Sequence, residues 1–145
     1  MRVVATSNTA EQILPMVQYS QDSIIRFDEG LIGFSDCKSF VLLESEGIAP
    51  FRRLQSTKRD EVGFLVLDTA YLTKEFPSLI PKRDWESIGL TNPAARLAFV
   101  ICSIGPTPAE STGNLQAPLI INYANMTGRQ VIIGDTEFSS RHPLV

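Results

Sequence analysis

Cysteine and histidine are scarce in this chain, which has two cysteines and one histidine in 145 residues. Disulfide frameworks and zinc sites require more cysteines or closely spaced ones, whereas Cys37 and Cys102 lie far apart in apolar surroundings. One histidine and scattered carboxylates likewise provide no recognisable spacing of metal ligands. We therefore predict two buried, reduced thiols, and neither a metal nor another cofactor.

The sequence also lacks a recognisable catalytic set. His142, the single histidine, lies near the C-terminus, where a histidine is more often structural or solvated than catalytic. A triad of His142, Asp135 and a serine at 139 or 140 can be drawn, but closeness in sequence does not provide triad geometry. No Gly-x-Ser-x-Gly motif is present either. We predict that the protein is not an enzyme, and a small acidic β-barrel hydrolase that uses His142 is the alternative.

Long apolar runs and dense positive charge are missing as well. No segment approaches the roughly 18 apolar residues of a membrane-spanning helix, and the N-terminus has no apolar region of signal-peptide length. The net charge is −3, and the basic pairs Arg52-Arg53 and Lys58-Arg59 are the densest. Nucleic-acid binders usually present a basic face. We therefore expect a cytoplasmic protein that binds neither membranes nor nucleic acid directly, which disfavours an RNA-binding barrel.

The chain does contain a series of short strand signals. Hydrophobic residues make up 43% of it and charged residues 20%, a composition typical of a globular domain. Apolar runs that continue without alternation indicate buried strands, and strands at short spacing with little helix are typical of a closed or nearly closed β architecture. The predicted strands are residues 23–27, 40–43, 51–56, 62–67 and 97–104, with two more in a C-terminal hairpin.

Helical signals are few. Residues 81–89 predict about two helical turns, with Pro81 near the start and Gly89 as a C-terminal stop. Residues 1–12 are polar and aperiodic, which favours a flexible N-terminal extension. We predict an all-β fold, in which residues 13–145 form one small antiparallel β-barrel-like domain with one or two short helical turns.

The C-terminal hairpin also carries candidate binding residues. Two β-branched runs flank an Asn- and Gly-rich segment at residues 124–128, a pattern that predicts a β-hairpin. Asn114, Gln116 and Asn122 flank the first run, and their amides can pair with a partner protein. They can equally satisfy turns and strand ends within the domain, so both interpretations stay open.

Two other segments offer candidate partner contacts. A glycine-punctuated turn carries Leu31, Ile32 and Phe34, which either form a contact patch or plug the end of the barrel, and we favour the plug. Arg141 and His142 either bind a partner or tie down the C-terminal tail, and we slightly favour the tail.

Several short motifs occur in order along the chain. They are IRFDEGLIGF at 25–34, PF at 50–51, LQS at 54–56, NLQAPLIIN at 114–122, GRQVII at 128–133 and RHPL at 141–144. This ordered set closely resembles the flagellar assembly factor FliW family, from about residue 23 to residue 144, and the resemblance depends on the combination of motifs rather than on one of them. This chain departs from the usual pattern at Ile32, where the family usually has Pro, at Gly113, where Val is common, and at Thr69, where Pro is frequent.

The resemblance implies a non-enzymatic regulator with a small β-barrel-like fold and two protein partners, flagellin and the RNA-binding translational repressor CsrA. Flagellin in excess occupies such a protein and leaves CsrA free to repress flagellin translation. When flagellin is exported, the freed protein captures CsrA and relieves the repression, and the resemblance implies that this inhibition is allosteric and leaves the RNA-binding surface of CsrA unoccupied. An acidic domain suits a basic RNA-binding partner, because opposite charges accelerate their encounter. We expect the free protein to be a monomer.

Overall fold

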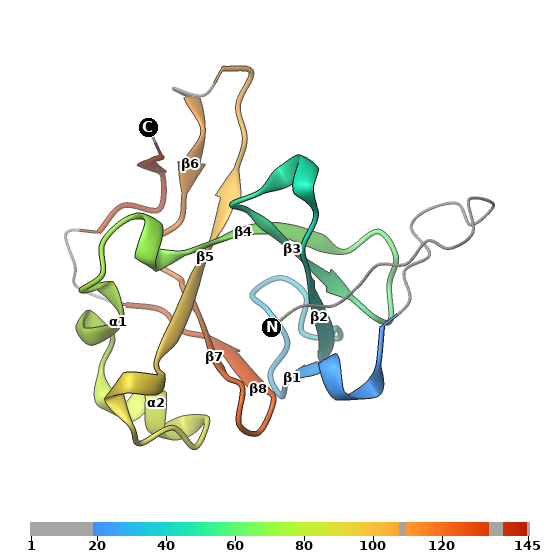
Figure 1. The fold of residues 1–145 in the computed structure, drawn as a ribbon, viewed down its shortest axis with the longest axis vertical. Coiled ribbons are helices and arrows are strands. Elements are labelled where there is room, and N and C mark those ends of the chain that lie inside the picture. The colour runs from blue at the N-terminus through green and yellow to red at the C-terminus, as the bar shows by residue number, and fades with distance from the viewer. Residues whose placement is uncertain (1–18, 108–109, 134–137, 145) are drawn as a thin grey trace.

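Seven strands form a closed barrel in the computed structural model, which describes residues 19–107, 110–133 and 138–144 (Figure 1). The strand order is β4-β3-β2-β1-β8-β7-β5, and pairing of β4 with β5 closes the barrel. Neighbouring strands are antiparallel except for β1 and β8, which are parallel. The predicted all-β barrel is therefore confirmed. The strands are β1 (Ile25–Phe27), β2 (Ser39–Leu43), β3 (Arg52–Ser56), β4 (Gly63–Asp68), β5 (Leu97–Ser103), β7 (Leu119–Asn122) and β8 (Thr127–Gln130).

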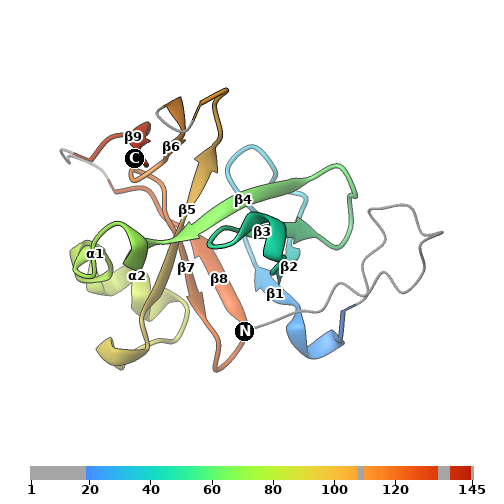
Figure 2. The ribbon, with the colours of Figure 1, turned by 45° about the horizontal axis from the view of Figure 1, so that its top comes forward.

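Two further strands extend the sheet outward from the end of β5. β6 (Thr112–Gly113) pairs with β5, and β9 (His142–Pro143) pairs with β6, so the C-terminal segment runs beside β6 (Figure 2). The Leu144 N–H donates to the Ser111 carbonyl at 3.0 Å and continues this pairing. The sequence predicted neither strand, because two-residue strands carry no hydrophobic period.

Strands β4, β5 and β7 are buried on both faces, which explains their continuous apolar runs. Successive side chains of a strand point to opposite faces. Phe99 therefore belongs to the core inside the barrel, whereas its neighbours Ala98 and Val100 belong to a second core outside it. Val66 and Leu67 divide in the same way. The predicted buried strands are thus confirmed, and the second core is the additional reason for their apolar character.

Short helices cover part of the second core. Figures 1 and 2 show α1 (Phe76–Leu79) and α2 (Lys82–Ser87) together beside the beginning of β5. Trp85 of α2 is fully buried, and its indole N–H donates to the Pro77 carbonyl at 3.2 Å, which joins the two helices. The predicted helical turns at residues 81–89 are confirmed by α2. The 3-10 helices are η1 (Gln21–Ser23), η2 (Glu46–Ile48), η3 (Thr69–Tyr71) and η4 (Pro93–Ala95).

The second strand of the C-terminal hairpin differs from the prediction. We expected it to begin at residue 129, but β8 begins at Thr127 and ends at Gln130. Gly128 pairs with Phe27 of β1, and a Cβ atom at this position would lie 2.6 Å from the Phe27 ring. The glycine interpreted as part of the turn is therefore needed for close contact between two barrel strands.

Both cysteines are free and buried, as the sequence predicted. The predicted N-terminal extension, residues 1–12, lies outside the described residues and stays a prediction. Within the described ranges, the helices are all too short and too polar to span a bilayer.

Candidate functional site

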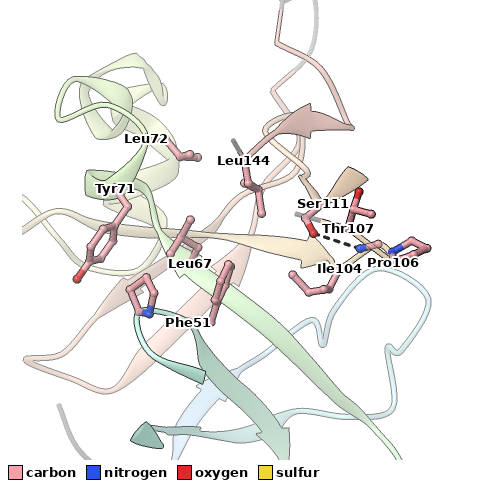
Figure 3. Close-up of a pocket in the computed structure, with 11 residues that line it drawn as sticks. Phe51, Leu67, Tyr71, Leu72, Ile104, Pro106, Thr107, Ser111 and Leu144 are labelled. Carbon is pink, nitrogen blue, oxygen red and sulfur yellow. Dashed lines mark hydrogen bonds between the residues drawn. The ribbon is translucent and has the colours of Figure 1, made fainter. Parts of the chain in front are cut away.

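An apolar groove of about 630 Å³ lies on the outside of the barrel, where β4 and β5 end (Figure 3). Figure 3 shows Phe51, Leu67 and Leu144 pointing from three separate segments toward one common space. Pro50, Ser111 and residues 105–107 complete the lining. We define the groove by its apolar side chains, which are Phe51, Leu67, Tyr71, Leu72, Ile104 and Leu144.

The groove is the uncovered continuation of the second core. Leu67 belongs to that core, and Phe51, Leu72 and Leu144 pack against it while remaining partly exposed. Helices α1 and α2 lie beside the beginning of β5, so they leave the region near its end open (Figures 1 and 2). The side chains of Tyr71 and Ile104 are 65% and 55% exposed at the margin. An exposed group of large apolar residues is typical of a protein or ligand contact.

Two polar depressions adjoin the groove, one at Phe51 and one at Ile104. The first, of about 330 Å³, shares Phe51 with the groove and is lined by Glu44, Glu46 and Arg52. The second shares Ile104 with the groove and contains Glu110 and Arg141 among its lining residues. The groove therefore has an apolar centre and charged side chains at both margins.

The glycine-punctuated turn places only one of its three candidate side chains on the surface. Leu31 is 2% exposed in the barrel core, and the ring of Phe34 packs edge-to-face against Phe64 with centroids 5.4 Å apart. A Cβ atom on Gly30, whose φ is +68°, would lie 2.6 Å from the Phe34 carbonyl oxygen. Ile32 is 56% exposed. Leu31 and Phe34 thus plug the barrel, and Ile32 is available to a partner.

Three of the motifs that are diagnostic in the sequence meet at this turn. The backbone N–H of Ile32 donates to Gln130 Oε1 at 2.8 Å, and Gln130 Nε2 donates to the Ala117 carbonyl at 3.1 Å. Glu29 also lies 3.8 Å from the guanidinium of Arg129. The side chain of Gln130 therefore holds residues 25–34 against residues 114–122.

The three candidate amide residues all form hydrogen bonds within the domain. Asn122 Nδ2 donates to the Ile88 carbonyl at 2.8 Å, and its Oδ1 accepts from the Ala124 N–H at 2.9 Å. Asn114 Oδ1 accepts from the Gln116 N–H at 3.0 Å. Gln116 Nε2 donates to the Phe138 carbonyl at 2.8 Å. The structural interpretation explains these amides, and contact with a partner stays a prediction.

The two C-terminal candidates differ in their surroundings. His142 lies in β9 opposite Gly113, and its side chain is half-buried. Arg141 is exposed and lines the second depression beside the groove. Ser139 Oγ accepts from the Arg141 N–H at 2.9 Å, and Asp135 lies outside the described residues. Neither the described geometry nor the comparisons below support the hydrolase alternative.

Burial shifts the pKa of two groups near these surfaces. It raises the pKa of the Cys102 thiol to about 11, because the apolar second core disfavours the thiolate. Burial also raises the pKa of the Tyr123 hydroxyl, although the positive charge of Arg52 opposes this effect. In the part of the chain that is described, no three His, Cys, Asp or Glu side chains are grouped to hold a metal ion.

The sequence did not predict the groove. Its apolar residues come from separate segments, and each is an ordinary apolar residue beside a turn or strand end. They form one surface only because pairing of β4 with β5 and docking of the C-terminal segment bring these segments together. Phe51 and Leu144 stand in the motifs at residues 50–51 and 141–144, but no local period or motif connects them with the other residues of the groove.

Comparison with known proteins identifies a single family. The family model described as FliW protein matches residues 8–144. The flagellar assembly factor FliW of Leptospira interrogans serogroup Icterohaemorrhagiae serovar Lai (strain 56601) is 34% identical over 130 residues, which cover 89% of this chain and 87% of that relative. Its counterpart from Natranaerobius thermophilus is 31% identical over 129 residues, covering 88% and 85%.

A solved structure shows the same relationship. The crystal structure of the flagellar assembly factor FliW superposes with a TM-score of 0.80 at 30% identity, and the match covers 88% of this chain and 89% of that chain. The family match and the fold both extend over nearly the whole sequence, and so the chain belongs to the FliW family of flagellar assembly factors.

Proposed function

We propose that this protein binds flagellin and CsrA in exchange, and thereby couples flagellin synthesis to flagellin export. The observation that carries the proposal is the FliW family match over residues 8–144. Flagellin retained in the cytoplasm occupies the protein, so CsrA is free to repress flagellin translation. Export of flagellin releases the protein to capture CsrA and relieve that repression. The protein acts as a monomeric, non-enzymatic binding module in the cytoplasm.

Two physical features support a role in protein binding. The net charge of −3 favours encounter with a basic RNA-binding protein such as CsrA. The groove offers exposed apolar side chains with charged margins, an arrangement common in protein interfaces. Among the sequence-derived candidates, Arg141 lies beside the groove and Ile32 is exposed at the turn. Arg141 is therefore a proposed contact of the groove, whereas Ile32 belongs to the turn, which is a separate candidate surface.

The proposal is tested by mixing the purified chain with its cognate CsrA and with monomeric flagellin on a size-exclusion column. We expect each partner to co-elute with the chain at micromolar concentration, and added flagellin to displace CsrA. Co-elution of neither partner would refute the proposal. Formation of a stable complex that contains all three proteins would refute the exchange mechanism while leaving partner binding intact.

A variant at His142 separates this function from a catalytic one. We expect His142→Ala to bind both partners about as well as the wild type, because half-buried His142 lines no part of the groove.

A gel shift tests the alternative of direct RNA binding. We expect the chain alone not to shift structured RNA. A shift at physiological salt would instead indicate direct RNA contact.

A further inference from the structure

We infer that the groove seats an apolar segment of a partner protein whose basic end lies against Glu44 and Glu46. This inference rests on the proposed function and deepens it, because it assigns the partner-binding surface and the chemistry that the surface selects. The groove contains no residue of the turn at 30–34 and none of the hairpin strands β7 and β8.

The centre of the groove selects apolar side chains. Its lining contains no charged residue, and the hydroxyl groups of Tyr71, Thr107 and Ser111 are its polar side-chain groups. Ser111 Oγ already accepts from the Gly105 N–H at 3.2 Å. A charged or strongly polar occupant would lose its hydration here without gaining partners. Aliphatic or aromatic side chains would instead cover the exposed parts of Tyr71 and Ile104.

The margin at Phe51 selects positive charge. Glu44 and Glu46 are exposed, and among the described residues neither carboxylate forms an ion pair. Arg52 lines the same depression, but among the described residues it forms no ion pair with either carboxylate, and its guanidinium carbon lies 5.8 Å from the ring centroid of Phe99. The two carboxylates are therefore free to meet lysine or arginine residues of an incoming segment.

The margin at Ile104 does not favour one sign of charge. Glu110 and Arg141 both line the depression that adjoins Ile104, and Glu110 Oε2 also accepts from Thr107 Oγ1 at 2.9 Å. The Phe51 margin has two carboxylates and one guanidinium, so it carries the excess of negative charge and gives the groove a direction. A bound segment places its basic end there and its apolar side chains over Leu67.

The apolar part of the inference is tested with matched isoleucine variants. Ile104→Glu introduces a charge at an exposed groove position, whereas Ile32→Glu introduces the same charge at a similarly exposed position of the turn. We expect Ile104→Glu to weaken binding of CsrA, flagellin or both by about tenfold or more, because it places a charge where an apolar side chain is covered in the complex. Ile32→Glu is expected to change both affinities by less than about twofold. Affinities are measured by titration calorimetry, and circular dichroism confirms that each variant is folded.

The outcomes separate this inference from the proposed function. If the wild type binds both partners and Ile104→Glu binds them equally well, the groove assignment is wrong but the proposed function stands. An equal loss for Ile104→Glu and Ile32→Glu also contradicts the assignment. If the wild type binds neither partner, the proposed function fails and the inference fails with it. A wild-type dimer that Ile104→Glu dissociates would show that a second copy fills the groove.

The charge part is tested with Glu46→Lys and with Asp22→Lys as its control. Both residues are exposed and both changes alter the net charge equally, but Asp22 lies in η1 and lines no part of the groove. We expect Glu46→Lys to weaken binding about threefold to tenfold more than Asp22→Lys does, and to reduce the salt dependence of the affinity. Equal effects of the two variants would refute a basic end at Glu44 and Glu46.

Discussion

The turn at residues 30–34 and the groove both carry apolar side chains, but the fold uses them in opposite ways. In the turn, Leu31 and Phe34 point into the barrel, and Gln130 fixes the backbone by accepting from the Ile32 N–H. In the groove, Tyr71 and Ile104 remain exposed beside the part of the second core that α1 and α2 leave open. The comparison shows that the turn motif holds the barrel together, whereas the surface suited to binding combines two motif residues, Phe51 and Leu144, with residues that no local motif marks.

The largest expected effect on stability distinguishes the buried Leu31 from the exposed Ile32 within the turn. We expect Leu31→Ala to lower the free energy of unfolding by about 3 kcal/mol, because it removes a buried side chain and leaves a cavity. Ile32→Ala, one residue later and 56% exposed, should change it by less than about 0.5 kcal/mol. Urea denaturation monitored by circular dichroism measures both. Equal losses would show that the turn does not plug the barrel.

A smaller effect is expected for the amide that joins the hairpin to the helices. Asn122 is buried and bonds both the Ile88 carbonyl and the Ala124 N–H. Asn122→Ala leaves the Ala124 N–H without this acceptor and removes one of two donors to the Ile88 carbonyl, so it should cost about 1–2 kcal/mol of unfolding free energy. Asn125→Ala is the matched control, because Asn125 also donates to Ile88 but is exposed. If Asn125→Ala destabilises the protein more than Asn122→Ala, the assigned structural role of Asn122 is wrong.

Burial of Cys102 in the second core should make the free energy of unfolding fall at alkaline pH. The pKa of the Cys102 thiol is about 11 in the folded protein, compared with the ordinary value of 9.0. The contribution of the neutral thiol to stability is therefore complete below pH 9 and is lost as the pH rises toward 11, because the unfolded chain ionises first. Cys102→Ala should show a smaller loss of unfolding free energy over this interval than the wild type. An identical loss in the two proteins would contradict burial of Cys102.

The smallest effect is expected in the groove. Ile104→Ala removes a side chain that is 55% exposed, so the free energy of unfolding should change by less than about 0.5 kcal/mol. Partner affinity should nevertheless fall measurably, because the same side chain is covered in the complex. Differential scanning calorimetry and titration of each partner provide the two values. A large loss of stability would place Ile104 with Leu31 among the structural residues.

The sequence predicted the barrel because hydrophobic periodicity records burial within each strand. The continuous runs in β4 and β5 were interpreted correctly as buried strands, and Pro81 and Gly89 marked α2. The sequence did not predict α1, β6 or β9, since elements of two to four residues are too short to show a period. Their formation depends on tertiary packing rather than on local preference.

Less of the candidate site than of the fold could be predicted from the sequence. The amide groups of Asn114 and Asn122 suggest polar contacts, but which contacts they make depends on the approach of Gln116 and Ile88 in the folded chain. The groove depends on the approach of Phe51 to Leu67 and of Leu144 to β6. Such surfaces become visible only when the register of the strands is known.

Hydrogen exchange of the chain alone and saturated with each partner tests most directly whether binding occurs at the groove or at the turn. For at least one partner, we predict slower amide exchange at residues 67–72 and 104–107, with residues 30–34 unchanged. Slower exchange at residues 30–34 with residues 67–72 and 104–107 unchanged, for both CsrA and flagellin, would contradict the groove as the binding surface.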